Sequence, residues 1–100
     1  MTTIDKGDSL MQTKVYMFYD PANECFWEKK LTYYKRKSIW KRKGDAKSAL
    51  RCIPHERVLN GLVPKVLHIY EFDLSNKDDL KSRLVEIIPD AHKYIETGEL

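Results

Sequence analysis

The residues best suited to chemistry lie in one basic and aromatic stretch, residues 29–51, which we call the basic segment. Lysine and arginine side chains neutralise phosphates, and tyrosine and tryptophan rings can stack on unpaired bases. This mixture favours single-stranded nucleic acid, RNA above all, over a duplex-reading helix. The candidate nucleic-acid-binding residues are Tyr33, Tyr34, Lys35, Arg36, Lys37, Trp40, Lys41, Arg42, Lys43, Lys47 and Arg51.

Charge is spread unevenly along the chain. The net charge is +3, yet residues 25–70 hold twelve Lys or Arg against three acids, whereas residues 71–100 hold four against eight. Such asymmetry indicates a charged partner. Two other interpretations of the cations stay open. They protect an exposed sheet edge from aggregation, or they dock on an acidic surface of a host or defence protein.

The acidic C-terminal third also has two interpretations. Its carboxylates imitate the phosphate spacing of nucleic acid and block a nucleic-acid-binding partner, or they form the solvated face of an amphipathic helix. We favour the helix because it explains the same residues more simply. The acids concerned are Asp73, Asp78, Asp79, Glu86 and Asp90.

Residues for catalysis are scattered. His55, His68 and His92 belong to no metal-binding array, and the chain has no P-loop, GxGxxG or GxSxG motif. Glu71 and Asp73 share one face of a predicted strand and are the only pair that we consider for Mg²⁺. We therefore predict a protein that is not an enzyme, with no catalytic residues, no metal site and no cofactor.

Cysteines and hydropathy point to the cytoplasm. Cys25 and Cys52 have no CxxC or Cys-x-His spacing, so we expect two small buried hydrophobic residues kept reduced. No apolar run approaches the ~20 residues needed to cross a bilayer. The N-terminal residues lack the pattern of a secretory signal. We expect a cytoplasmic protein without membrane association.

The first half of the chain predicts a hairpin and a helix. A flexible leader is expected over residues 1–13, followed by strands at 15–19 and 25–29 around a turn at 20–23. Residues 38–43 read as a further short strand. Asp45 is expected to cap a helix from Ala46 to Cys52, which Pro54 interrupts before another turn at residues 55–59. Asn60-Gly61 is a stop signal.

The second half predicts a central strand and a second helix. Residues 66–74 alternate as a strand that joins the hairpin. A helix is then expected to begin at Ser75 or Asn76 and to end at Pro89, followed by a short helical turn in residues 90–100. The apolar stripe of this predicted helix consists of Leu80, Leu84, Val85, Ile87 and Ile88. Residues 14–100 therefore predict a single α+β domain. Its small antiparallel sheet (β-hairpin plus central strand) has two helices packed on one face.

Three stretches of the chain resemble small early-region accessory proteins of tailed bacteriophages. An aromatic hairpin beginning Lys14-Val15-Tyr16 precedes Trp40-Lys41-Arg42-Lys43-Gly44-Asp45-Ala46-Lys47-Ser48-Ala49-Leu50, which is similar to the pattern W-x-x-K-G-x-A-K-x-x-L. A strand over residues 66–72 follows. The resemblance covers residues 14–74 and implies a non-enzymatic protein that acts on host or defence machinery, such as a CRISPR or toxin–antitoxin component, in the host cytoplasm.

Overall fold

A four-stranded antiparallel sheet in the order β2-β1-β5-β6 is the central element of the fold, in a computed structural model that describes residues 13–30, 36–75 and 78–100. The strands of this sheet are β1 (Lys14–Asp20), β2 (Cys25–Trp27), β5 (Leu67–Asp73) and β6 (Lys81–Ile88). Of the predicted leader, only Thr13 is described. Tyr33, Tyr34, Lys35 and Asn76 also lie outside the described residues.

The predicted hairpin and central strand are confirmed. Phe18 of β1 lies opposite Trp27 of β2 on one side and opposite Ile69 of β5 on the other. Asp20 shapes the turn between β1 and β2, since its Oδ1 accepts hydrogen bonds from the amides of Ala22 and Asn23. An aspartate that bonds the backbone two residues on is a strong local turn signal.

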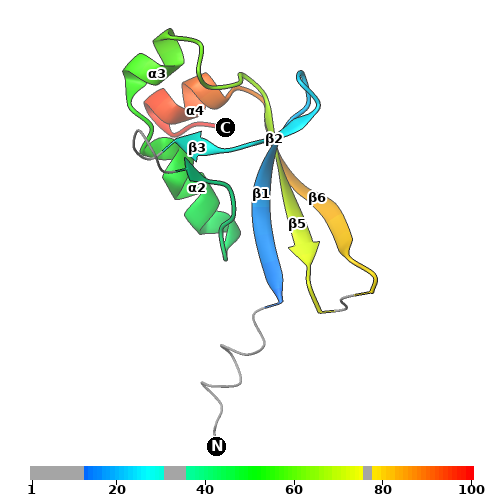
Figure 1. Ribbon diagram of the computed structural model, residues 1–100. Coiled ribbons are helices and arrows are strands. Elements are labelled where there is room, and N and C mark those ends of the chain that lie inside the picture. Colours follow the sequence, from blue (N-terminus) through cyan, green and yellow to red (C-terminus); the bar gives the residue numbers. More distant parts are fainter. Residues whose placement is uncertain (1–12, 31–35, 76–77) are drawn as a thin grey trace, which may run out of the picture.

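Helices α2 (Lys43–Arg51), α3 (His55–Leu59) and α4 (Ala91–Thr97) form a layer on one side of the sheet (Figure 1). Burial of apolar side chains between this layer and the sheet is the main stabilising contribution. The small α+β fold with helices on one face is thus confirmed, with three described helices. The core between the layers consists of Phe18, Trp40, Ala46, Leu50, Ile53, Val63, Leu67, Ile69, Ile88, Ala91, Tyr94 and Ile95.

The second predicted helix is wrong, because residues 81–88 form strand β6, antiparallel to β5. A register shift lies between Ile69 and Tyr70, so Glu86 pairs with Ile69 but Leu84 pairs with Tyr70. Val85 is the extra residue of this β-bulge. The bulge puts Leu84 and Ile87, three residues apart, on the same face of the sheet, a spacing that is also typical of a helix.

Two smaller predictions in the basic segment are also corrected. Helix α2 begins at Lys43, and its N-cap residue Arg42 makes no side-chain cap hydrogen bond, so Asp45 lies in the first turn rather than at the cap. Residues 38–43 do not form the predicted strand; only Trp40 makes an isolated bridge. A separate two-stranded ribbon pairs β3 (Lys29–Lys30) with β4 (Arg36–Lys37).

Cys25 and Cys52 are exposed free thiols, so their predicted burial is wrong. Cys25 is the first residue of the short edge strand β2, and Cys52 is the C-cap residue that follows α2. A residue close to each cysteine is buried instead. Trp27 packs against the core, and Ile53 lies within the core. Both cysteines occupy element ends that the core does not reach.

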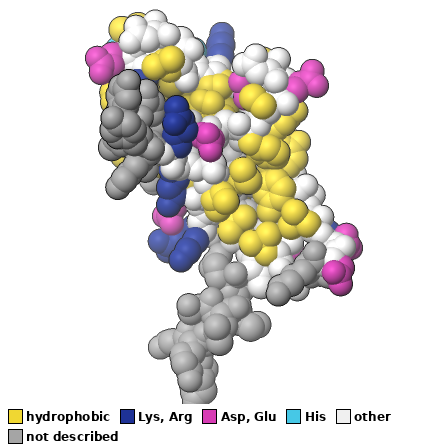
Figure 2. All heavy atoms as spheres, in the orientation of Figure 1, with side chains coloured by type: hydrophobic (Ala, Val, Ile, Leu, Met, Phe, Trp, Pro, Cys, Tyr) yellow, Lys and Arg dark blue, Asp and Glu magenta, His cyan; other side chains and the backbone are white. Residues whose placement is uncertain are grey.

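The face of the sheet that points away from the helices is apolar and aromatic, and we call it the open sheet face. Residues paired across neighbouring strands stand on the same face. The open sheet face therefore has three rows: Phe26, Tyr19, His68 and Ile87; Met17, Tyr70 and Leu84; Val15, Phe72 and Ser82. Figure 2 shows hydrophobic side chains gathered over this side of the molecule.

Candidate nucleic-acid interface

The described residues of the basic segment are distributed over the ribbon strands β3 and β4, a connecting loop and α2. The helix forms because Ala46 and Leu50, four residues apart, bury one side against the core while the other side stays polar. Asp45 in its first turn adds favourable charge at the positive end of the helix dipole. The cations of the segment therefore spread around the outside of the helical layer.

Trp40 anchors the segment to the sheet and is only 5% exposed. Its backbone amide and carbonyl exchange hydrogen bonds with Tyr16 of β1, and its ring lies edge-on to Phe18 with 5.3 Å between ring centroids. A ring held this way has no free face for a base. Trp40 is therefore part of the core, and its predicted role as a stacking platform is corrected.

Two lysines of α2 share one carboxylate. Lys43 Nζ lies 3.1 Å from Glu86 Oε1, and Lys47 Nζ lies 2.8 Å from Glu86 Oε2. Burial alone would raise the pKa of Glu86, but the hydrogen bonds from Lys47 and Lys43 bring that pKa below its ordinary value. A carboxylate from the acidic C-terminal third thus partly neutralises the basic segment within the molecule.

Other cations of the segment bind the helical layer itself. Lys29 Nζ donates a hydrogen bond of 2.8 Å to the carbonyl of Ala49 near the end of α2. The guanidinium of Arg51 lies 5.8 Å from the centre of the Tyr94 ring, and Lys47 Nζ lies 5.9 Å from it. These cation–π contacts use the charges to join α2 to α4.

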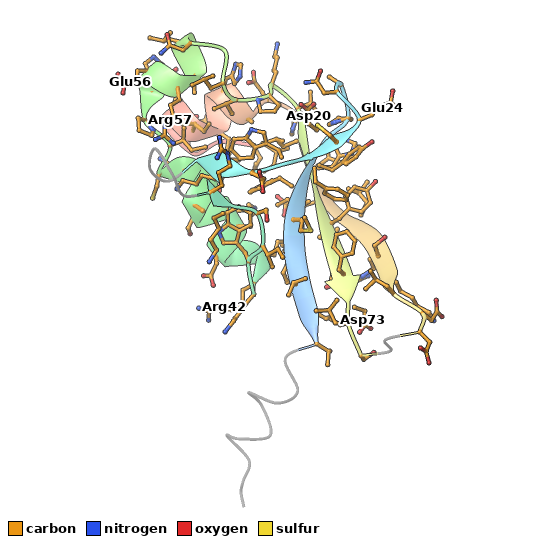
Figure 3. The ribbon with its side chains drawn as sticks, in the orientation of Figure 1. Asp20, Glu24, Arg42, Glu56, Arg57 and Asp73 are labelled. Atoms are coloured by element: carbon orange, nitrogen blue, oxygen red, sulfur yellow. The ribbon has the colours of Figure 1, made fainter. Side chains whose placement is uncertain are left out.

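Four exposed cations lie at the junction between β4 and α2, namely Arg36, Lys37, Lys41 and Arg42, and we call them the junction cations. Arg42 Nε pairs with Asp45 Oδ2 at 3.0 Å, yet the Arg42 side chain is 79% exposed. Figure 3 shows Arg42 and Arg57 at two ends of the helical layer, with α2 between them. The junction cations are the part of the predicted site that is best placed to meet a polyanion.

A cavity of about 230 Å³ opens beside the junction cations. Trp27, which is half-buried, and apolar side chains line it together with three cations and one carboxylate. This volume is smaller than the ~300–1,000 Å³ of sites that enclose a drug-sized ligand, so the cavity fits one planar ring or one anionic group. The residues lining this Trp27 cavity are Trp27, Glu28, Lys29, Arg36, Ile53, Arg57, Leu62 and Val63.

Sequence patterns did not assign Trp27, Arg57, Leu62 or Val63 to a site. They come from β2, α3 and the loop before β5, and only the packing of α3 near the β3–β4 ribbon brings them to one cavity. Arg36 links the predicted site to the cavity, because it is a junction cation and also lines the cavity wall. One local feature of the sequence could have indicated Trp27 as a site residue: it is an aromatic residue that lies just before the basic segment.

Glu71, one of the two carboxylates of β5 that we considered for Mg²⁺, is buried. Glu71 accepts hydrogen bonds of 2.9 Å from Arg83 Nε and from Tyr16 Oη, and Lys14 Nζ lies 3.9 Å away. The bond from Arg83 is the main reason that the pKa of Glu71 lies below its ordinary value. Burial is the main reason that the pKa of Tyr16 is raised. Within residues 13–30, 36–75 and 78–100 no group of three His, Cys, Asp or Glu is placed to hold a metal ion.

Comparisons with protein-family models, with curated proteins and with solved structures give no match for this chain. Among the described residues, no helix is long and apolar enough to cross a membrane.

Proposed function

We propose that this protein binds single-stranded nucleic acid, RNA in particular, through the junction cations and the Trp27 cavity. The observation that carries the proposal is the position of Arg36, which is exposed on β4 beside Lys37 and also lines the cavity with Trp27. A phosphate backbone following the junction cations would place a neighbouring base at the indole. Neutralised phosphates release counterions, and the aromatic wall adds stacking.

The setting of this activity is also a proposal. From the resemblance to early-region accessory proteins of tailed bacteriophages, we propose that the protein acts in the host cytoplasm, without catalysing a reaction, to counter a host defence. The lysines of α2 contribute less to binding in this proposal than the sequence suggested, since Glu86 already pairs with them. Tyr33, Tyr34 and Lys35 stay predicted contacts.

The test is the affinity for a fluorescently labelled single-stranded RNA, measured by anisotropy over a series of salt concentrations. The variant Arg36→Ala/Lys37→Ala/Arg42→Ala should bind more weakly than wild type, and its salt slope should flatten by about 0.7 for each phosphate that it no longer neutralises. The matched control is Lys65→Ala/Lys81→Ala/Lys93→Ala, which removes the same charge from exposed positions outside the basic segment. The control should bind nearly as well as wild type.

Tryptophan fluorescence tests the cavity separately. Bound RNA should quench the emission of half-buried Trp27 and leave that of buried Trp40 little changed. In Trp27→Phe the quenching should therefore nearly disappear, although the junction cations are intact. Quenching that survives in this variant would contradict a base in the Trp27 cavity.

A second candidate function is inhibition of a host or defence protein by docking on its acidic surface. The pairing of Lys43 and Lys47 with Glu86 supports it, because ammonium groups of the basic segment already pair with a carboxylate at hydrogen-bond distance within the molecule. The two candidates differ in partner. Failure of wild type to bind RNA at low salt, together with stoichiometric capture of one host protein after RNase treatment, would replace the RNA proposal by this one.

A further inference from the structure

The open sheet face is continuous, and its rings contact one another. Tyr19 contacts three of the other rings. Its ring centroid lies 5.2 Å from that of Phe26, 5.7 Å from that of Tyr70 and 6.4 Å from that of His68. Phe26 in turn lies 5.6 Å from Phe72. None of these rings belongs to the core beneath the helices, and the described helices lie on the other side of the sheet (Figure 1). One face of the sheet is thus packed while the other is a preformed aromatic layer.

Much of this face is exposed to water. Phe26 and Leu84 are each 42% exposed and Ile87 is 50% exposed, and the remaining residues of the three rows are partly exposed. A single aromatic side chain has roughly 150–250 Å² of surface to bury. Summed over its partly exposed side chains, the open sheet face therefore exposes on the order of 500 Å² of mainly apolar surface. Patches of this size on soluble proteins commonly mark interaction sites.

The composition of the face selects its partner. None of its ten residues is Asp, Glu, Lys or Arg. A nucleic acid or a strongly charged protein would find no counter-charge on it and would lose hydration from its own charges. An uncharged, apolar partner surface loses no hydration of charged groups when it binds. The same face on a second copy of the chain is a surface of this kind. Tyrosine and serine hydroxyls in the rows suit an interface that is apolar with a few polar groups.

The area is also sufficient for self-association. Two copies facing each other would bury about 1,000 Å² in total, the size at which specific interfaces begin. Sheets stack face to face about 10 Å apart with their strands inclined by roughly 30°. That arrangement puts the helical layers, the junction cations and the Trp27 cavity of both copies on the outside.

We propose that the open sheet face is the interface of a homodimer, in which two copies of the sheet pack face to face. This inference does not depend on the proposed nucleic-acid binding. It predicts a concentration-dependent dimer whose strength does not fall with salt, since no ion pair crosses the interface. It also predicts that the junction cations play no part in association.

Sedimentation velocity or light scattering of the full chain, from about 1 to about 200 µM, tests the proposal by mass action. Wild type should move from 11.8 kDa towards twice that mass as concentration rises. Ile87→Lys, on the edge strand β6, should weaken the dimer by about tenfold or more, because it buries a charge at the interface. Leu84→Asn should act in the same direction if the lysine variant folds poorly by circular dichroism.

The matched control is Leu59→Lys, which introduces the same charge at a 73% exposed leucine of α3. It should dimerise as wild type does, and so should the Arg36→Ala/Lys37→Ala/Arg42→Ala variant. The proposal is overturned if wild type stays monomeric at about 200 µM, the highest concentration of the series. Equal dimerisation of folded Ile87→Lys and wild type, or dimers that RNase dissociates, would overturn it as well.

Discussion

Tyr16 and Trp40 exchange two backbone hydrogen bonds, with N–O distances of 2.8 and 3.0 Å, and this bridge fixes the basic segment to the middle of the sheet. The Trp40 ring then fills the core beside Phe18. The residue that looks most suited to stacking is therefore the one that holds the surrounding cations in place. Its contribution is structural, and it sets the position of the junction cations on either side of it.

Trp40→Ala should lower the free energy of unfolding by about 3–5 kcal/mol, the range for deleting a large buried aromatic side chain. Chemical denaturation followed by circular dichroism measures this change. The neighbouring Ile39 is exposed, so Ile39→Ala is the matched control and should change stability by less than about 0.5 kcal/mol. Similar stabilities for the two variants would show that Trp40 is not in the core.

Glu71→Gln should make the protein less sensitive to acid. The folded-state pKa of Glu71 lies below its ordinary value of 4.5, chiefly through the hydrogen bond from Arg83. A carboxyl whose pKa is lowered on folding stabilises the fold above its unfolded pKa, and this stability is lost as pH falls through the folded pKa. Unfolding free energies of wild type should therefore fall more steeply below about pH 5 than those of the variant.

Glu96→Gln, at an exposed position of α4, is the control for the acid titration. It should reproduce the wild-type slope of stability against pH. A Glu71→Gln curve parallel to the wild-type curve through the acid range would contradict the role of the Arg83–Glu71–Tyr16 contacts.

Glu86→Gln should strengthen RNA binding, if the proposed function holds. The substitution removes the carboxylate that Lys43 and Lys47 share and leaves both ammonium groups available to phosphates. The salt dependence of binding should become steeper by about 0.7 for each additional phosphate that these lysines neutralise. Anisotropy titrations measure both effects, and Glu96→Gln again serves as the control because it changes net charge equally. A weaker affinity of Glu86→Gln than of Glu96→Gln would contradict the expected competition.

Gly98→Ala should destabilise the fold more than Gly61→Ala. Both glycines have positive φ, +80° and +73°, so both substitutions carry the strain of about 1–2 kcal/mol that an alanine has there. A side chain at Gly61 meets nothing within 4 Å, whereas one at Gly98 meets the guanidinium of Arg51. Because the guanidinium is the end of a flexible exposed side chain, Arg51 can move aside, so the expected extra loss is its cation–π contact with Tyr94, about 0.5–1 kcal/mol. Thermal melts of the two variants measure the difference, and equal melting temperatures would contradict the contact.

The sequence predicts best where local chemistry and tertiary packing agree. The Asp20-Pro21 turn, the alternation of β5 and the stop at Asn60-Gly61 each depend on neighbouring residues, and all three appear in the structure. Strand β6 resembles a helix in sequence because its bulge at Val85 gives a strand the spacing of a helix. A bulge is specified by the partner strand, which a single stretch of sequence does not reveal.

The candidate site was only partly predictable for a similar reason. Lysine and arginine content located the basic segment, but the pairing of Lys43 and Lys47 with Glu86 depends on a contact between residues about 40 positions apart. The Trp27 cavity needs α3 and β2 to meet. Burial of Trp40 likewise follows from the bridge to Tyr16, which no local pattern indicates.

The place of β1 inside the sheet has a consequence for biosynthesis. β1 leaves the ribosome before α2 and α3, yet its neighbour β5 emerges only after the whole of both helices. Until then the edge of β1 that pairs with β5 is unpaired, and the β1–β2 hairpin of the sheet is marginally stable in water. The four-stranded sheet therefore cannot form until β5 and β6 have left the ribosome. The hairpin is the segment that a chaperone would shield during translation.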